Sequence, residues 1–305
     1  MTTPGATALL ASALFAFHSN PWLNLHHFVR AVARGEPAGA DLTAAERQDW
    51  DAVVALYRER YAQRDLLFDE GMVAIKTALR RAEKQETLAG LGLEPALAAV
   101  LERAAPVYRR HWWPQHDRDN RAWIAAVEPA LAAHGPALAR AVPAAYGRTW
   151  PAQPIDVDLS VQAGPFGAYT TSGPPTHVTI SSQDPRYRVC ALEMLFHEAS
   201  HAWDDVPTQG IARAAAAQGK TSPRQLWHAV LFFTAGELTR RELAASGDED
   251  YVEHALRSGA YDRACGGCRP LLAKHWGPRL DGRASVEAAL AALVAAVEAP
   301  VARAP

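Results

Sequence analysis

Apolar residues recur every three or four positions through most of the first half of the chain, which predicts amphipathic helices. The first helix is expected to begin at Ser19-Asn20-Pro21, where a capping side chain precedes a proline. A second begins at Thr43, which forms a capping box with Glu46 three residues later. The same spacing continues over 66–82, 94–108 and 119–134. The pattern therefore predicts a helical N-terminal region, residues 1–149.

The pattern changes near Trp150. Residues Ile155 to Val161 alternate between apolar and polar side chains, as in a half-buried strand. Two shorter strands are expected at Ala168–Thr171 and Val178–Ile180, separated by turns rich in glycine and proline. We interpret the three strands as a small antiparallel β-meander. Helical spacing returns from Tyr187 onward, so the fold class is α+β and helix-dominated.

This second region, residues 150–305, is expected to be either a separate domain or a continuation of the first one. A chain of 305 residues with 49% hydrophobic and 21% charged content is long and apolar enough to form a sizeable core. The net charge of −2 provides no broad basic surface, which argues against nucleic acid as a partner. Three cysteines are too few for a disulfide framework. Since no apolar run reaches the roughly 18 residues of a membrane span, we expect a soluble protein without one.

The N-terminal segment Ala6–Phe17 is apolar and contains Ala11-Ser12-Ala13, which is similar to a signal-peptide cleavage site. A secretory signal also needs basic residues before its apolar part, and Met1 to Thr7 contain none. An export signal and an apolar segment that packs on the protein body are both open interpretations. Localisation therefore stays undetermined at this stage.

The segment 192–203 carries the candidate chemistry, in the string His197-Glu198-Ala199-Ser200-His201. On a helix, His197 and His201 lie one turn apart on the same face, as two ligands of one zinc ion must. Glu198 lies beside that pair, where its carboxylate can accept a proton from a water molecule on the metal. The surrounding side chains are apolar, and buried imidazoles and carboxylates need compensation for lost solvation. A core helix with hydrogen-bonded histidines is the alternative interpretation.

This string resembles the H-E-x-x-H zinc metallopeptidases, the zincins. The resemblance implies one tetrahedral zinc ion with a third protein ligand and an open position for water. Residues 202–207, Ala-Trp-Asp-Asp-Val-Pro, lack the glycine and third histidine that metzincins carry at this point. The gluzincin branch instead takes a glutamate from a second helix.

Glu237 is our expected third ligand. Ser222-Pro223 starts a second helix, on which Glu237 shares a stripe with Leu226, Val230 and Phe233. A carboxylate on an apolar stripe is costly unless it is paired or bound to a metal. Gly236 beside it would let the two helices approach closely. The alternative is that Glu237 pairs with Arg240 or Arg241, three and four residues later.

Two further roles follow from the expected zinc site. Glu193 and Asp205, each four residues from one of the histidines, are candidate acceptors for the imidazole N–H groups. Stabilising the carbonyl oxygen during hydrolysis requires another donor. Tyr251, His254 and Tyr261 are the candidates that follow the third ligand, and we favour Tyr251 as a catalytic residue.

The sequence thus predicts a zinc-dependent hydrolase of amide bonds in peptide or protein substrates. An edge strand at Ala168–Thr171 could hold an extended peptide by strand pairing. The competing hypothesis is a helical binding protein in which zinc is structural or absent. A di-iron carboxylate protein would need a second E-x-x-H on another helix, and the chain has none. Cys265-Gly266-Gly267-Cys268 has no second C-x-x-C pair and is expected to be a dithiol or a local disulfide.

Overall fold

The computed structural model describes residues 10–164, 167–171 and 176–297. Residues 6–9 of the apolar N-terminal segment, and parts of the turns expected near 165 and 174, lie outside the described residues. The chain forms two compact units, and each is described by itself. The first unit contains Met1–Ala126 and Pro154–Val189, and the second contains Val127–Gln153 and Cys190–Pro305. The chain thus passes between the units three times, where the sequence suggested a single division at residue 150.

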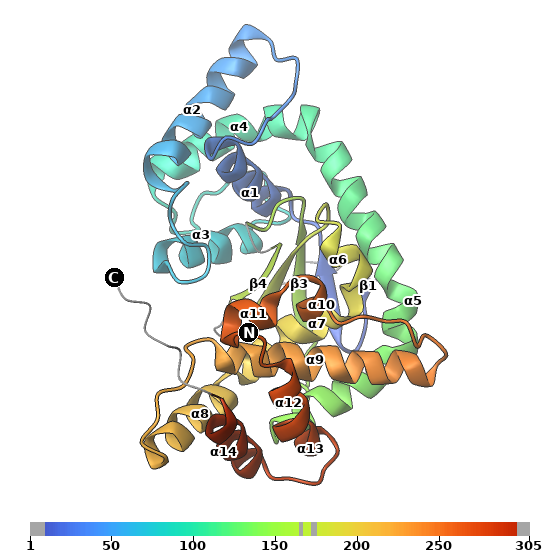
Figure 1. Ribbon diagram of the computed structural model, residues 1–305. Coiled ribbons are helices and arrows are strands. Elements are labelled where there is room, and N and C mark those ends of the chain that lie inside the picture. Colours follow the sequence, from blue (N-terminus) through green and yellow to red (C-terminus); the bar gives the residue numbers. More distant parts are fainter. Residues whose placement is uncertain (1–9, 165–166, 172–175, 298–305) are drawn as a thin grey trace. The chain divides into compact units, whose positions relative to one another are not determined.

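The first unit contains a sheet with the strand order β1-β2-β3-β5-β4. Its strands are β1 (Leu10–Ala11), β2 (Phe15–His18), β3 (Ile155–Ser160), β4 (Ala168–Thr171) and β5 (His177–Ser181). Strand β3 pairs in parallel with both β2 and β5, while β4 pairs with β5 in antiparallel fashion. Figure 1 labels β1, β3 and β4 of this sheet.

This topology corrects the expected antiparallel meander. The three predicted strands exist, but β5 lies between β3 and β4 and runs parallel to β3. Alternation of apolar and polar residues indicates a strand, yet it contains no information about which strand is the neighbour or in which direction it runs. The prediction that Ala168–Thr171 is an edge strand is confirmed, since β4 pairs only with β5 among the described strands. In the N-terminal apolar segment, Phe15 and Phe17 are buried within β2.

The helices predicted for the first half of the chain are confirmed. They are α1 (Pro21–Ala33), α2 (Ala44–Arg60), α3 (Glu70–Arg81), α4 (Pro95–His111) and α5 (Trp113–Ala145), with the short α6 (Arg186–Val189) after the sheet. The Asn20 side chain accepts hydrogen bonds from the first N–H groups of α1. Thr43 and Glu46 form the predicted capping box of α2.

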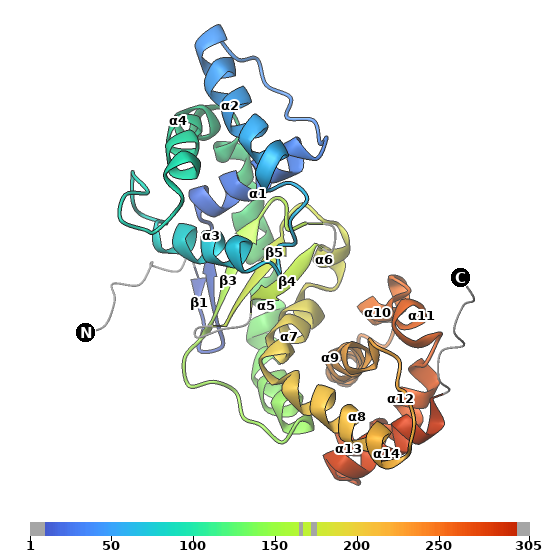
Figure 2. The same cartoon turned by 90° about the vertical axis from the view of Figure 1, so that its left-hand side faces the viewer.

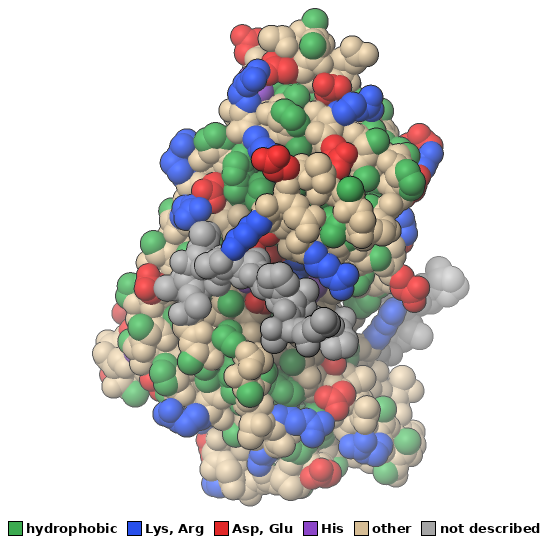
Figure 3. Space-filling view, turned by 180° about the vertical axis from the view of Figure 1, so that it is seen from behind, with side chains coloured by type: hydrophobic (Ala, Val, Ile, Leu, Met, Phe, Trp, Pro, Cys, Tyr) green, Lys and Arg blue, Asp and Glu red, His purple; other side chains and the backbone are tan. Residues whose placement is uncertain are grey.

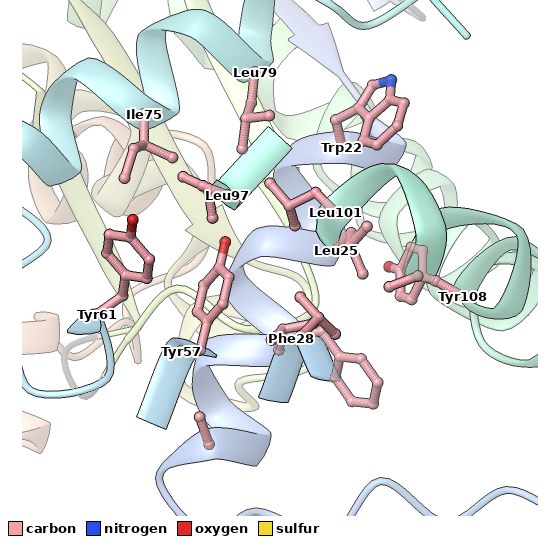
Figure 4. Packing of buried hydrophobic residues seen from close by; sticks show 14 of the residues in the cluster. Trp22, Leu25, Phe28, Tyr57, Tyr61, Ile75, Leu79, Leu97, Leu101 and Tyr108 are labelled. Atoms are coloured by element: carbon pink, nitrogen blue, oxygen red, sulfur yellow. The ribbon is translucent and has the colours of Figure 1, made fainter. Parts of the chain in front are cut away.

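The core of the first unit lies between α1, α2, α3 and α4. Figure 4 shows the contributing side chains, which are Trp22, Leu25, Phe28, Tyr57, Tyr61, Ile75, Leu79, Leu97, Leu101 and Tyr108. Each is at least 93% buried, with Phe28 and Ile75 the most exposed at 7%. Burial of each such side chain contributes roughly 1.5–3 kcal/mol of transfer free energy. The periodic apolar positions in the sequence are therefore the ones that form this core.

Helix α9 (Leu226–Ala245) is the central element of the second unit. The unit also contains α7 (Ala191–Ser200), the 3-10 turn η1 (His201–Trp203), α8 (Asp205–Ala217), α10 (His254–Arg257), α11 (Ala260–Cys265), α12 (Arg269–His275), α13 (Gly277–Leu280) and α14 (Val286–Ala296). Helices α7, α8, α10, α11 and α12 all contact α9, which Figure 2 shows nearly end-on. Because α9 is covered on several sides, it carries apolar residues on more than one face.

The surface carries both signs of charge. On the face shown in Figure 3, lysine and arginine side chains are interspersed with aspartate and glutamate. This distribution agrees with the net charge of −2. Within the part of the chain that the structure describes, every helix is too short or too polar to cross a lipid bilayer.

Candidate metal centre

Three imidazole rings meet where α7 approaches α9. His197 lies in α7, His201 begins the 3-10 turn that follows it, and His228 lies in the first turn of α9. The centroids of the three rings are 5.2 Å apart in each of the three pairs. Each residue offers one ring nitrogen, and these nitrogens lie within 4.8 Å of one another.

The donor set and its spacing fit zinc. Tetrahedral zinc with Zn–N distances of 2.0–2.1 Å places two ligand nitrogens about 3.3–3.4 Å apart. The Nε2 atoms of His197 and His228 are 3.3 Å apart. A hydrogen bond between two neutral imidazoles would also give this distance. It would not explain why the third ring, His201, stands at the same centroid separation from both.

The environment keeps the imidazoles in the form that binds metal. Burial, followed by the positive charges of His201 and His228, holds the pKa of His197 well below its usual value. Burial and then His201 lower the pKa of His228 to about 3. Both rings are therefore neutral at pH 7, with a lone pair available for a cation.

Aromatic side chains hold the rings in place. Phe232 stacks on His197 with ring centroids 3.8 Å apart and an interplanar angle of 11°. Trp227 stacks on His228 at 5.0 Å and meets the His201 ring edge-on at 5.8 Å. These contacts restrict the ring orientations, and their apolar surfaces lower the local dielectric constant.

The site is closed on one side and open on the other. His197 is 1% exposed and Glu198 is 4% exposed. The side chain of His201, in contrast, is 15% exposed, and His228 is also only partly buried. Solvent thus reaches part of the cluster, at His201 and His228.

Glu237, the expected third ligand, does not join this cluster. Its carboxylate accepts hydrogen bonds from Arg240 Nη2 at 2.8 Å and from Arg241 Nε at 2.7 Å. It follows His228 by nine residues, which is about 13–14 Å along a helix axis. Burial acts to raise the pKa of Glu237, but the hydrogen bonds from Arg240 and Arg241 outweigh it and hold the pKa low. The alternative of an ion pair three and four residues along the helix is the one that the structure contains.

Sequence reasoning missed His228 because it followed only one stripe of α9. That stripe includes Phe233, which packs against Arg269. The Cζ atom of Arg269 lies over the Phe233 ring, 5.6 Å from its centroid. His228 and Phe232 are four residues apart on a different face, and both meet His197. The sequence does carry the signal for a second buried stripe, because α9 is apolar on more than one side. This second stripe contains His228.

The expected close approach at Gly236 is confirmed. A Cβ atom there would lie 3.1 Å from Glu193 Oε1 and 3.0 Å from Glu253 Cγ. The packing here is tight, because a Cβ atom at this position would force the Glu193 or Glu253 side chain to move by a few tenths of an ångström.

The three candidates for stabilising the carbonyl oxygen have different partners. The Tyr251 hydroxyl donates to Glu193 Oε2 at 2.6 Å, and the backbone N–H of His254 donates to the same oxygen at 2.9 Å. The Tyr261 hydroxyl donates to Glu253 at 2.9 Å. The ring of His254 stacks on Phe232, with centroids 6.1 Å apart. The catalytic role expected for Tyr251 stays a prediction, and its hydroxyl would have to leave Glu193 to perform it.

The expected acceptors for the imidazole N–H groups are engaged elsewhere. Glu193 binds Tyr251 and His254 as described, and Asp205 Oδ2 accepts a hydrogen bond from Arg148 at 3.1 Å. The Asp204 carboxylate lies 3.8 Å from His201 Nδ1. Cys265 and Cys268 form a disulfide, one of the two states expected for this pair.

Comparison of the chain with protein-family models, with curated proteins and with solved structures gives no match. Function is therefore inferred from the geometry and chemistry of the three histidines and Glu198.

Proposed function

We propose that this protein is a zinc-dependent hydrolase of amide bonds in peptides or proteins. His197, His201 and His228 are the proposed zinc ligands, and Glu198 is the proposed general base. The observation that carries the proposal is the triangle of three imidazoles at equal 5.2 Å separations, with a glutamate next to one of them in the chain. Three imidazole ligands with a fourth position left for water are a known catalytic form of zinc binding.

If the three histidines held zinc, the ion would lower the pKa of a water molecule to about 7 and would polarise the carbonyl of the substrate. The chain's own groups perform the proton transfers. Glu198 accepts the proton of the attacking water and then gives it to the nitrogen of the leaving amine. The partial exposure of His201 and His228 gives a substrate access, which favours a catalytic site over the competing hypothesis of a closed structural one.

The general base is tested by Glu198→Gln. The substitution keeps the size of the side chain and removes its ability to accept a proton, so we expect unchanged zinc content and a loss of at least about 100-fold in kcat/KM on a peptide substrate. Zinc content is measured by elemental analysis and turnover with a mixed peptide library. Activity equal to that of the wild type would exclude Glu198 as the base.

The ligand set is tested by comparing His228→Ala with Glu237→Gln. Loss of a ligand should weaken zinc binding by at least about 100-fold, more than the 10–100-fold that loss of a second-shell hydrogen bond costs. Glu237→Gln should leave zinc affinity unchanged, because its carboxylate is bound to arginines. His134→Ala is the matched control, since His134 contacts Glu242 and lies outside the cluster. A zinc affinity that falls with Glu237→Gln and not with His228→Ala would reverse the assignment.

A further inference from the structure

A second candidate site lies in the first unit, in a pocket of about 210 Å³. Much of its lining comes from α1, from the C-cap residue of α1 and from the segment that follows β3, namely His27, Arg30, Arg34, Gln162 and Gly164. Gln162 and Gly164 follow the carboxyl end of β3, which is paired in parallel on both sides. The carboxyl ends of parallel strands are where open sheets commonly bind ligands. The pocket is smaller than the 300–1,000 Å³ typical for drug-sized ligands.

Arg30 is a buried cation without an anionic partner in this pocket. It is 7% exposed, its Nη2 donates to the backbone oxygen of Arg64 at 2.8 Å, and its Nε has no hydrogen-bond partner. Among the described residues, none forms an ion pair with its guanidinium, and Asp65 acts on it through a longer-range coulombic interaction. A buried charge is stable only when a partner compensates for its lost hydration. Here the hydrogen-bond partner of Arg30 is a neutral carbonyl, Asp65 adds a favourable coulombic interaction, and burial still lowers the pKa of Arg30.

Two more cations stand close to the same pocket, and they too have neutral partners. Arg34 lines the pocket and donates to the backbone oxygen of Ala62 at 2.9 Å and to the side-chain oxygen of Gln63 at 3.2 Å. Lys76 is fully buried behind Leu66, a residue of the pocket wall, and its Nζ donates to the Leu66 backbone oxygen at 2.6 Å. Arg34 thus adds a second charge to the pocket lining, whereas burial lowers the pKa of Lys76 to about 7, so Lys76 is only partly charged at neutral pH.

His27 forms a neutral part of the wall. Its Nε2 faces the Tyr169 hydroxyl at 2.8 Å and its Nδ1 faces Ser160 Oγ at 3.2 Å. Burial, followed by the charges of His26 and Lys76, holds the pKa of His27 well below its usual value. His27 thus shapes the pocket and adds no charge, so the binding energy for an anion must come from the arginines.

We propose that this pocket binds a small molecule through a carboxylate or phosphate group, with Arg30 and Arg34 as its cationic partners. An oxyanion would pair with the guanidinium group of Arg30 and compensate the buried charge. Glu36 lines the pocket and is exposed, so it disfavours ligands that carry several negative charges. The site is in the first unit and does not depend on the proposed zinc chemistry of the second.

Calorimetric titration with inorganic phosphate, acetate and succinate tests the proposal. Ionic strength is held constant with chloride, so that screening does not mimic binding. We expect saturable binding by at least one probe at millimolar concentration. Binding of phosphate alone identifies a phosphate site, and binding of acetate or succinate alone a carboxylate site. Absence of saturable binding by all three up to about 10 mM would overturn the proposal.

Variants separate the pocket from general surface charge. Arg30→Gln and Arg34→Gln should each weaken binding by at least about 10-fold, since each removes one charge-assisted hydrogen bond. Arg34 is exposed, so its variant is expected to fold even if Arg30→Gln does not. Arg103→Gln, an exposed arginine of α4 outside the pocket, should bind as the wild type does. Equal affinity of Arg34→Gln, Arg103→Gln and the wild type would exclude the pocket as the site.

Discussion

At the scale of single residues, Glu193 shows how burial changes an acid in the second unit. Its side chain is fully buried, and burial raises its pKa to about 7 although Tyr251 and the His254 N–H donate hydrogen bonds to it. Its other oxygen, Oε1, has no hydrogen-bond partner and faces Gly236. Glu193 of α7 therefore lies against α9 and hydrogen-bonds to Tyr251 and His254. Its carboxyl group is buried there with one oxygen unpaired, which is unfavourable for the ionised form.

This shift predicts a pH dependence of stability. The folded protein binds the Glu193 proton more tightly than the unfolded chain does, whose pKa is near 4.5. The contribution of Glu193 to stability is therefore full below about pH 4.5 and falls as the pH rises through 7. When the pH rises from 5 to 8, the free energy of unfolding should fall less in Glu193→Gln than in the wild type. The two decreases should differ by on the order of 2 kcal/mol.

Urea unfolding at the two pH values measures this difference. Glu249→Gln, at an exposed position of the same unit, is the control and should follow the wild type. If Glu193→Gln shows the same change between pH 5 and pH 8 as the wild type, the carboxyl of Glu193 does not titrate in this range.

At the scale of elements, α9 decides the composition of the site because it uses two faces. One face presents His228 and Phe232 to His197 of α7. Another carries Phe233, which lies below Arg269, and Thr234, whose hydroxyl accepts a hydrogen bond from Trp276. The distance between α7 and α9 is limited by Gly236, so the packing of these helices and the spacing of the histidines are linked.

Gly236→Val tests this link. The new side chain would collide with Glu193 and Glu253, and overpacking of this kind typically costs 1–3 kcal/mol. We expect that loss in the free energy of unfolding, together with weaker zinc binding, because α7 must move away from His228. Gly277→Ala is the control, since a Cβ atom there meets no atom within 4 Å. Wild-type stability and zinc affinity in Gly236→Val would show that the helix spacing does not limit the site.

At the scale of the whole molecule, the two candidate sites belong to different units. Every residue of the histidine cluster lies in the second unit, and every residue that lines the arginine pocket lies in the first. Ligand binding stabilises the part of a protein that holds the ligand, and local stability is visible in hydrogen exchange.

Chelation should therefore act on one unit only. After removal of zinc we expect faster amide hydrogen exchange in α7 and α9, and unchanged exchange in α1 and β3 of the first unit. Mass spectrometry of peptides from the chelated and the zinc-loaded protein measures both. Loss of protection throughout the second unit would support the competing hypothesis of a structural zinc ion. Equal changes in both units would contradict the assignment of zinc to the histidine cluster.

The sequence alone determined the features that depend on neighbours along the chain. The caps at Asn20 and Thr43, the helices of the first half and the juxtaposition of His197 and His201 all follow from contacts within four residues, and the structure contains them. Such contacts are set by helix geometry, which the pattern of side chains is sufficient to predict.

Only the tertiary structure decided which distant residues meet. The parallel pairing of β3 with β5 and the placement of His228, in place of Glu237, beside the two histidines depend on the directions and faces with which separate elements pack. Because α9 has apolar stripes on more than one side, the sequence does not determine whether His228 or Glu237 lies beside His197 and His201. Packing resolved it, since the Glu237 carboxylate is stabilised by arginines on its own helix, and His228 lies against the rings of Trp227 and Phe232.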